Sequence, residues 1–308
     1  MDALLEPATL AVTVRALTPI LLLAYAGYLS QRAGVFNIAL EGHLLLSAFF
    51  AVWGSFTFGS PAAGVLAAVA AGVAYSLLLA LATLSFKADD FVVGVALNLL
   101  AVGVTGYLLR TVFDTRGSFD HPDIAGLRSY EIAGVKSVPL LAELFSGHTS
   151  ITYVALLCPP VVAFVVSRTR FGLRLRGAGS HPAAAASLGV SPVRIGYGAL
   201  VLCGVLGGLA GAQLSIGHIT LFSTNMSAGR GWIAVVVVML AGPSALRVFA
   251  TALMFTLIVA AGLRLQTTGL PVQVTEALPF VATIVGLVAS GRRRARSPRW
   301  AKGVAPRS

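Results

Sequence analysis

Polar side chains inside apolar stretches are the first residues of this chain that point to chemistry. Glu41 opens one such stretch, and Asn98 lies well within another. Polar groups are unfavourable in lipid and usually face the interior of a helix bundle or a cavity. Asn98 therefore predicts either a hydrogen bond between helices or contact with a polar solute. For Glu41 a structural role is favoured, as a cap on helix amides or as the partner of a cation.

Two short segments that contain such residues resemble each other. The sequence NIALEGH occupies positions 37–43 and NMSAGRG occupies 225–231, each with an asparagine before a charged residue beside glycine. Matching interruptions that enter a membrane from opposite sides are typical of inverted repeats around a transport path. Chance similarity between two glycine-containing helix starts is the alternative. The residues predicted to line a substrate path are Asn37, Glu41, Asn98, Asn225 and Arg230.

The sequence offers no arrangement typical of catalysis or of metal binding. Its histidines are scattered without ligand spacing, and no nucleophile, base and orienting group fall together. The phosphate-binding pattern G-x-x-x-x-G-K-[ST] is absent, because no lysine follows a glycine. We therefore predict no enzyme activity, no metal and no cofactor in this chain, so that any ATP must be bound by another one.

The composition indicates that lipid surrounds most of the chain. Of its 308 residues 57% are hydrophobic and 11% charged, whereas a soluble domain has about 25% charged residues. The net charge of +11 does not indicate nucleic-acid binding, because the basic residues cluster between apolar runs, as in cytoplasmic loops of membrane proteins. Cys158 and Cys203 lie within apolar runs and are interpreted as small buried hydrophobic residues.

The apolar runs predict an all-α polytopic membrane protein of about nine helices around an inverted-repeat core. One run, at 231–240, is too short to span comfortably and is interpreted as a half-helix or a broken helix. The run at 192–216 contains two overlapping small-xxx-small patterns of glycine, which predict close approach of another helix. The other predicted spans are 10–30, 38–58, 62–86, 92–112, 151–167, 248–265 and 275–290.

Charge sets the predicted orientation. The loop 113–150 is rich in acidic residues, whereas 167–194 contains arginines and no acid, so the first is placed outside and the second inside. Counting spans from these loops puts the N-terminus outside and the C-terminus inside, provided that 231–240 enters the membrane. The chain then divides into a membrane domain at 1–290 and a basic cytoplasmic tail at 291–308 that associates with lipid.

Five motifs occur in consistent order between about residues 27 and 290: GVFNIALEG at 34–42, VVGVALN at 92–98, a basic alanine-rich stretch at 172–190, AGRGWIA at 228–234 and LPF at 278–280. Together they resemble the permeases of bacterial ABC importers in the branched-chain amino acid and simple-sugar superfamily. The resemblance is greatest to the nucleoside and simple-sugar branch, in particular to the shorter of its two paired permeases.

The resemblance implies a multi-pass permease of the bacterial plasma membrane that imports nucleosides or related small polar solutes. It implies as partners two cytoplasmic ATPase subunits, a second related permease and an external substrate-binding lipoprotein. The stretch 172–190 matches the loop that docks on the ATPase in such families, and its proline and glycine signals predict a short capped helix at 182–188. The residues expected to couple to the ATPase are Arg174, Arg176, Gly177, His181, Pro182, Ala184, Ala185, Leu188 and Gly189.

Two alternatives stay open at this point. One is a simple-sugar permease of the same superfamily, and the other is an ion-coupled secondary carrier that works alone. A carrier driven by protons or sodium usually needs carboxylates at mid-membrane, and only Glu41 and Glu276 approach an apolar run.

Overall fold

The computed structural model describes residues 7–131, 146–266 and 281, with side chains from 12 to 131, from 146 to 262 and at 281. Its helices are α1 (Pro7–Arg32), α2 (Leu40–Phe58), α3 (Pro61–Ala80), the π-helical turn η2 (Leu81–Ser85), α4 (Asp90–Phe113), α6 (Ser150–Arg168), α7 (Arg170–Ser180), α8 (Pro182–Ser187), α9 (Pro192–Ile216), α10 (Arg230–Ala241) and α11 (Ala245–Gln266). Its strands are β1 (Ser118–Asp120), β2 (Ser129–Tyr130), β3 (His148–Thr149) and β4 (Leu221–Ser223).

Six of the described helices are long and apolar enough to cross a membrane, namely α1, α3 with η2, α4, α6, α9 and α11. The predicted run at 192–216 coincides with α9, and the other predicted runs between residues 10 and 265 agree with helices to within a few residues. The helix α10 has 12 residues, or about 18 Å, which is short of the roughly 30 Å hydrocarbon core. The predicted class, a helical membrane protein, is thus confirmed. The predicted span at 275–290 lies outside the described ranges, except for residue 281.

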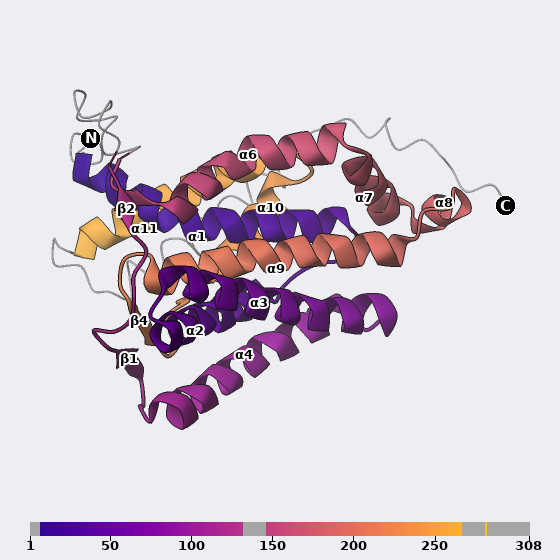
Figure 1. The fold of residues 1–308 in the computed structure, drawn as a ribbon. Coiled ribbons are helices and arrows are strands. Elements are labelled where there is room, and N and C mark those ends of the chain that lie inside the picture. The colour runs from indigo at the N-terminus through magenta and orange to yellow at the C-terminus, as the bar shows by residue number, and fades with distance from the viewer. Residues whose placement is uncertain (1–6, 132–145, 267–280, 282–308) are drawn as a thin grey trace.

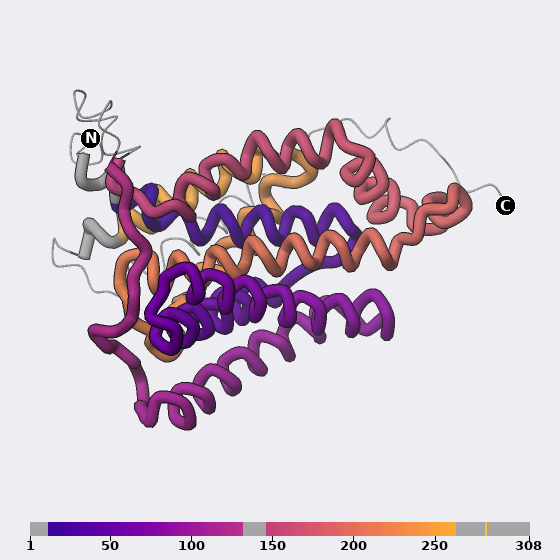
Figure 2. The backbone as a smooth tube through the Cα atoms, in the orientation of Figure 1, coloured from indigo at the N-terminus to yellow at the C-terminus, as the bar shows by residue number. Residues whose placement is uncertain are grey.

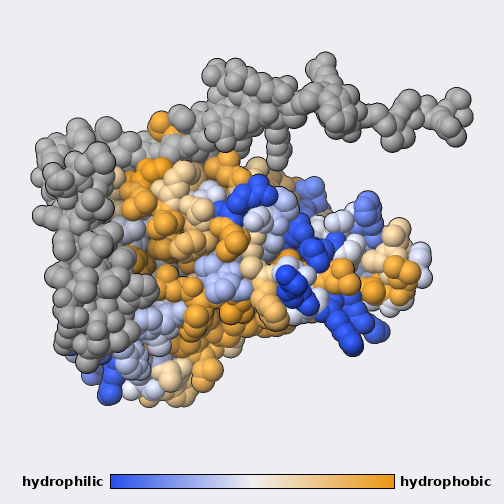
Figure 3. Space-filling view, turned by 90° about the horizontal axis from the view of Figure 1, so that it is seen from above, coloured by the Kyte–Doolittle hydropathy of each residue, from blue (hydrophilic) through white to orange (hydrophobic). Residues whose placement is uncertain are grey.

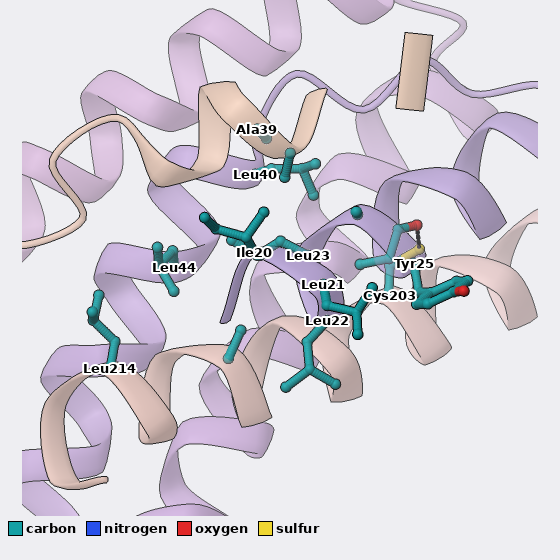
Figure 4. Close-up of a cluster of buried hydrophobic side chains, with 14 of the residues drawn as sticks. Ile20, Leu21, Leu22, Leu23, Tyr25, Ala39, Leu40, Leu44, Cys203 and Leu214 are labelled. Atoms are coloured by element: carbon teal, nitrogen blue, oxygen red, sulfur yellow. Dashed lines mark hydrogen bonds between the residues drawn. The ribbon is translucent and has the colours of Figure 1, made fainter. Parts of the chain in front are cut away.

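The helix α1 is the centre of the bundle. In Figure 1 it lies between α6 and α9, and it also packs against α10 and α11. Leu21, Leu22 and Leu23 follow one another around α1 and are all fully buried (Figure 4), as expected for a helix that is apolar on every side. The thiol of Cys203 on α9 donates a hydrogen bond to the carbonyl of Ala26 at 2.8 Å.

The glycines of α9 bring two helices close, not one. Gly204 and Gly208 face α3, whereas Gly207 and Gly211 face α2. A Cβ on Gly207 would lie 2.5 Å from the ring of His43, so only glycine leaves room for that ring. The predicted close approach is confirmed, and each of the two overlapping patterns accommodates a different helix.

The two ends of the bundle differ in structure. Figure 1 shows α7 and α8 at one end, and the strands β1, β2 and β4 at the other. We call these the α7–α8 end and the strand end. The strand β1 pairs antiparallel with β4, which ties the loop after α4 to the segment before α10. The strands β2 and β3 also pair antiparallel. Hydrophilic side chains gather towards the α7–α8 end, while apolar ones cover the middle of the face in Figure 3, where lipid would surround the protein.

The helix α4 stands apart from the rest of the bundle. In the tube of Figure 2 it runs along one edge, with α6 at the opposite edge. It packs against α2 and touches α3 only lightly. Its residues Leu99, Val102 and Tyr107 are exposed by half or more, so one apolar face of α4 is open beside α2.

Candidate functional site

The helices α2 and α10 both begin within the bundle, and their first turns touch. Before α2 the chain runs through the irregular link 33–39, most of which is buried. Before α10 the loop 217–229 ends on Gly229, whose φ of 78° lies in the left-handed region that favours glycine. A Cβ on Gly231 would collide with the backbone of Glu41. The two segments whose sequences resemble each other therefore meet at their helix starts.

The carboxylate of Glu41 joins the two helices. Its Oε1 accepts a hydrogen bond from the amide of Gly229 at 2.9 Å, and its Oε2 accepts one from the amide of Gly231 at 2.7 Å. The first amides of a helix lack acceptors within the helix itself, and Glu41 also stands in the first turn of α2. Each helix N-terminus has a positive charge of about +0.5, so one carboxylate offsets two converging helix dipoles. Glu41 has the capping role that the sequence favoured.

Asn98 of α4 holds the start of α2 from another side. Its Oδ1 accepts from the amide of Gly42 at 2.7 Å, and its Nδ2 donates to the carbonyl of Ile38 at 3.1 Å. The side chain is only 9% exposed. Both functions of the amide are bonded to backbone, which is the interhelical bond expected as one of the two alternatives for this residue.

Asn37 and Arg230 lie near the junction but have other partners. Oδ1 of Asn37 accepts from the amide of Ala39 at 3.0 Å and so turns the chain into α2. Nη1 of Arg230 donates to the carbonyls of Met226 at 3.0 Å and Ser227 at 3.3 Å, which holds the guanidinium on its own loop. Asn37 and Arg230 were both predicted to line the substrate path, but neither lines the cavity beside this junction.

That cavity has a volume of about 370 Å³, within the range of small-molecule sites. We call it the junction cavity. Three predicted path residues, Glu41, Asn98 and Asn225, come together in its wall. The remaining lining consists of Gly42, Leu45, Val95, Leu99, Val102, Ser227, Gly229 and Trp232.

Ser227 is the polar residue of the junction cavity that sequence reasoning missed. Its side chain is fully buried, and its Oγ has no hydrogen-bond partner within the described part of the chain. A buried hydroxyl left unpaired is unfavourable by about 1–3 kcal/mol, so a polar solute or water bound there would stabilise it. Its position inside the segment 225–231 could have indicated a role, but a serine in a loop between helices does not by itself predict a binding residue.

The residues predicted to couple to an ATPase lie together at the α7–α8 end. The helix predicted at 182–188 is α8, while α7, which the sequence did not predict, comes directly before it. The side chain of Leu188 is 84% exposed, whereas Ala185 is buried. Of the other predicted residues Arg176 is half-buried, and the exposed ones are Arg174, Gly177, His181, Pro182, Ala184 and Gly189.

Comparison with known proteins gives matches over most of the chain. Residues 9–288 match the family described as branched-chain amino acid transport system / permease component. The guanosine ABC transporter permease protein NupQ of Bacillus subtilis is 34% identical over 75% of this chain and 73% of its own length. The nucleoside ABC transporter permease protein NupC of Lactococcus lactis is 30% identical over 88% of each chain. A putative glucose ABC transporter permease protein, TsgC13 of Haloferax volcanii, is 33% identical over 84% of this chain and 78% of its own.

A solved structure shares the fold. It shows an inward-facing conformation of a putative metal-chelate type ABC transporter, with a TM-score of 0.54 over 92% of this chain and 85% of that chain. The identity between the two sequences is 18%, so the similarity concerns the arrangement of helices alone.

Proposed function

This chain belongs to the family of permease components of branched-chain amino acid transport systems, and we propose that the solute it carries is a nucleoside. It is a multi-pass plasma-membrane protein and the permease subunit of an ABC transporter. Two of the relatives are named as guanosine and nucleoside permeases, which supports the proposed solute. A glucose permease of similar identity makes a sugar the competing candidate.

The junction cavity is the observation that carries the proposal. A nucleoside offers ribose hydroxyls and the edges and faces of its base, without charge. The lining includes the buried Ser227 and the exposed Asn225, which can form hydrogen bonds, and Trp232, which offers an aromatic surface. Aromatic side chains stack on nucleobases, with a contribution of about 1–3 kcal/mol per base.

Transport by alternating access would use the two helices that begin at the cavity. Phe56, near the end of α2, contacts Phe119 of β1 at the strand end, with ring centroids 5.2 Å apart. The end of α10 lies the other way, because the hydroxyl of Tyr28, near the end of α1, donates to the carbonyl of Pro243 at 3.1 Å. The two helices thus run to opposite ends, as in an inverted repeat. Rocking of one repeat against the other would expose the cavity to each side in turn.

The proposed orientation places the strand end and the N-terminus outside, and the α7–α8 end and the tail at 291–308 inside. It includes about nine membrane helices, counting α2, α10 and the span predicted at 275–290. The arginines of 168–176 and the few acidic residues at the α7–α8 end support this orientation through the positive-inside rule.

The proposed partners are those that the family implies, and the lack of an ATP-binding pattern in this chain supports separate ATPase chains. Two cytoplasmic ATPase domains would dock on α7, α8 and the exposed Leu188. A second, related permease would complete the membrane part, and an external lipoprotein would deliver the solute. The arginine-rich tail would associate with anionic lipid, where each basic residue contributes on the order of 1 kcal/mol.

Uptake by the complete transporter in proteoliposomes tests the proposed function. We expect labelled guanosine to accumulate only when ATP is supplied on the ATPase side, and unlabelled glucose not to compete. Accumulation of glucose without guanosine would replace the nucleoside by the sugar. Accumulation that continues without ATP, or with an ATPase whose nucleotide-binding lysine is replaced, would contradict ATP-driven import.

A further inference from the structure

The junction cavity has no free charge, although Glu41 lines it and Arg230 lies near it. The carboxylate of Glu41 is bonded to the amides of Gly229 and Gly231. The guanidinium of Arg230 is bonded to carbonyls of its own loop. These two charged groups act on one another electrostatically but form no direct ion pair in the described structure. Each charge is therefore satisfied by backbone groups and not by a solute.

Glu41 stands where an anion would otherwise bind. A helix N-terminus has free amides and a positive dipole, and it is a natural site for phosphate. Here two such termini converge, so without a carboxylate the wall would present about one full positive charge from the dipoles alone. Glu41 removes both attractions, because it occupies the amides of α10 and offsets both dipoles.

Ser227 is the buried polar group that remains in the cavity wall, beside the exposed Asn225. It lines the junction cavity, it is fully buried, and its Oγ is without a partner in the described structure. A hydroxyl both donates and accepts a hydrogen bond, and it can pair with a solute hydroxyl without the penalty of burying an ion. Asn98 is not available for this purpose, because both ends of its amide are bonded to backbone.

We propose that the junction cavity selects uncharged, hydroxyl-bearing solutes over their phosphorylated forms, with Glu41 as the residue that excludes anions and Ser227 as the residue that bonds to the solute. The inference rests on the proposed transport function of this cavity, and it would hold for a nucleoside or for a sugar. Phosphate esters of both solutes are therefore suitable probes.

Binding to the complete transporter complex in nanodiscs tests the exclusion of anions. We expect guanosine to bind at least about tenfold more tightly than guanosine 5′-monophosphate, a difference of about 1.4 kcal/mol. The substitution Glu41→Gln keeps the size of the side chain and removes its charge, and it should reduce this preference by about tenfold or more. Asp90→Asn is the matched control, because the Asp90 carboxylate also accepts from a backbone amide, that of Phe36 at 2.7 Å, away from the cavity.

The role of Ser227 is tested by removing its hydroxyl. Ser227→Ala should weaken guanosine binding by about fivefold, the effect of one hydrogen bond. Ser47→Ala is the matched control, because Ser47 is equally buried and also has an unpaired Oγ, but it does not line the cavity. Its substitution should leave the affinity unchanged.

The outcomes separate the two proposals. If glucose binds in place of guanosine, and glucose 6-phosphate does not, the nucleoside assignment fails and the charge selection stands. If the wild-type complex binds neutral and phosphorylated solutes equally, or if Asp90→Asn changes the preference as much as Glu41→Gln, the charge selection is wrong. If Glu41→Gln does not assemble, the wild-type preference and the comparison of Ser227→Ala with Ser47→Ala still decide the matter.

Discussion

Oε2 of Glu41 lies 2.7 Å from the amide nitrogen of Gly231, a residue 190 positions later in the chain. Through this contact the first turn of α10 depends on a side chain of α2. Because the free amides at a helix start need acceptors, the junction links the starts of α2 and α10. A change at either residue is expected to affect both helices.

Glu41→Ala should destabilise the folded permease by about 1.5–3 kcal/mol, because two backbone amides lose a charged acceptor. Thermal unfolding of the purified complex measures the effect. Asp89→Ala is the control, since Asp89 caps the exposed start of α4 by accepting from Phe91 and Val92, and loss of such a cap costs about 1 kcal/mol. A loss for Glu41→Ala no larger than that of the control would argue against the junction as a stabilising element.

Asn98→Ala should lower stability by about 1–3 kcal/mol, because the amide of Gly42 and the carbonyl of Ile38 lose their partner. Asn98→Asp should be worse, since it loses the donor to Ile38 and buries a charge. Uptake of labelled guanosine and thermal unfolding should be measured on the same preparations. Should uptake fall while the unfolding temperature stays constant, Asn98 would have to contact the solute directly.

Gly207→Ala should destabilise the contact between α9 and α2 by about 1–3 kcal/mol, because the added methyl group collides with the ring of His43. Gly103→Ala offers a matched control on α4, where nothing lies within 4 Å of an added Cβ. Its stability should stay within about 1 kcal/mol of wild type. Equal effects of the two substitutions in a thermal unfolding assay would be inconsistent with tight packing at Gly207.

Leu188→Asp should uncouple the permease from its ATPases without unfolding it. The side chain is 84% exposed after α8, so the substitution removes an apolar contact only when a partner covers that surface. The measurement is solute-stimulated ATPase activity of the reconstituted complex, which we expect to fall severalfold. Ile219→Asp introduces the same charge on a side chain 53% exposed near the strand end. Coupling that survives in Leu188→Asp, or is lost equally in both, would place the docking surface elsewhere.

The sequence could predict most of the helices but not the junction between them. The boundaries of α9 followed from Ser191 and Pro192 at its start and from its apolar run. The contact between Glu41 and Gly231 could not be predicted, because periodicity gives no distance between segments 190 residues apart. The resemblance of 37–43 to 225–231 was the one hint that they belong together. The helix α7 was missed because it is short and has few apolar residues, although Gly172, Leu175 and Ala178 are buried on one face of it. The side chain of Thr169 caps its first turn by accepting from the amide of Gly172 at 3.1 Å.

The separation of Glu41 from its two amides also has a consequence for biogenesis. A ribosome adds about 5–20 residues per second, so the 190 residues between Glu41 and Gly231 take about 10–40 s to appear. During that time the carboxylate has entered the translocation machinery without the amides that it will bind. An unpaired carboxylate in lipid is unfavourable, so water or the insertion machinery must shield the start of α2 until α10 is made. The last third of the chain therefore completes the insertion of its second helix.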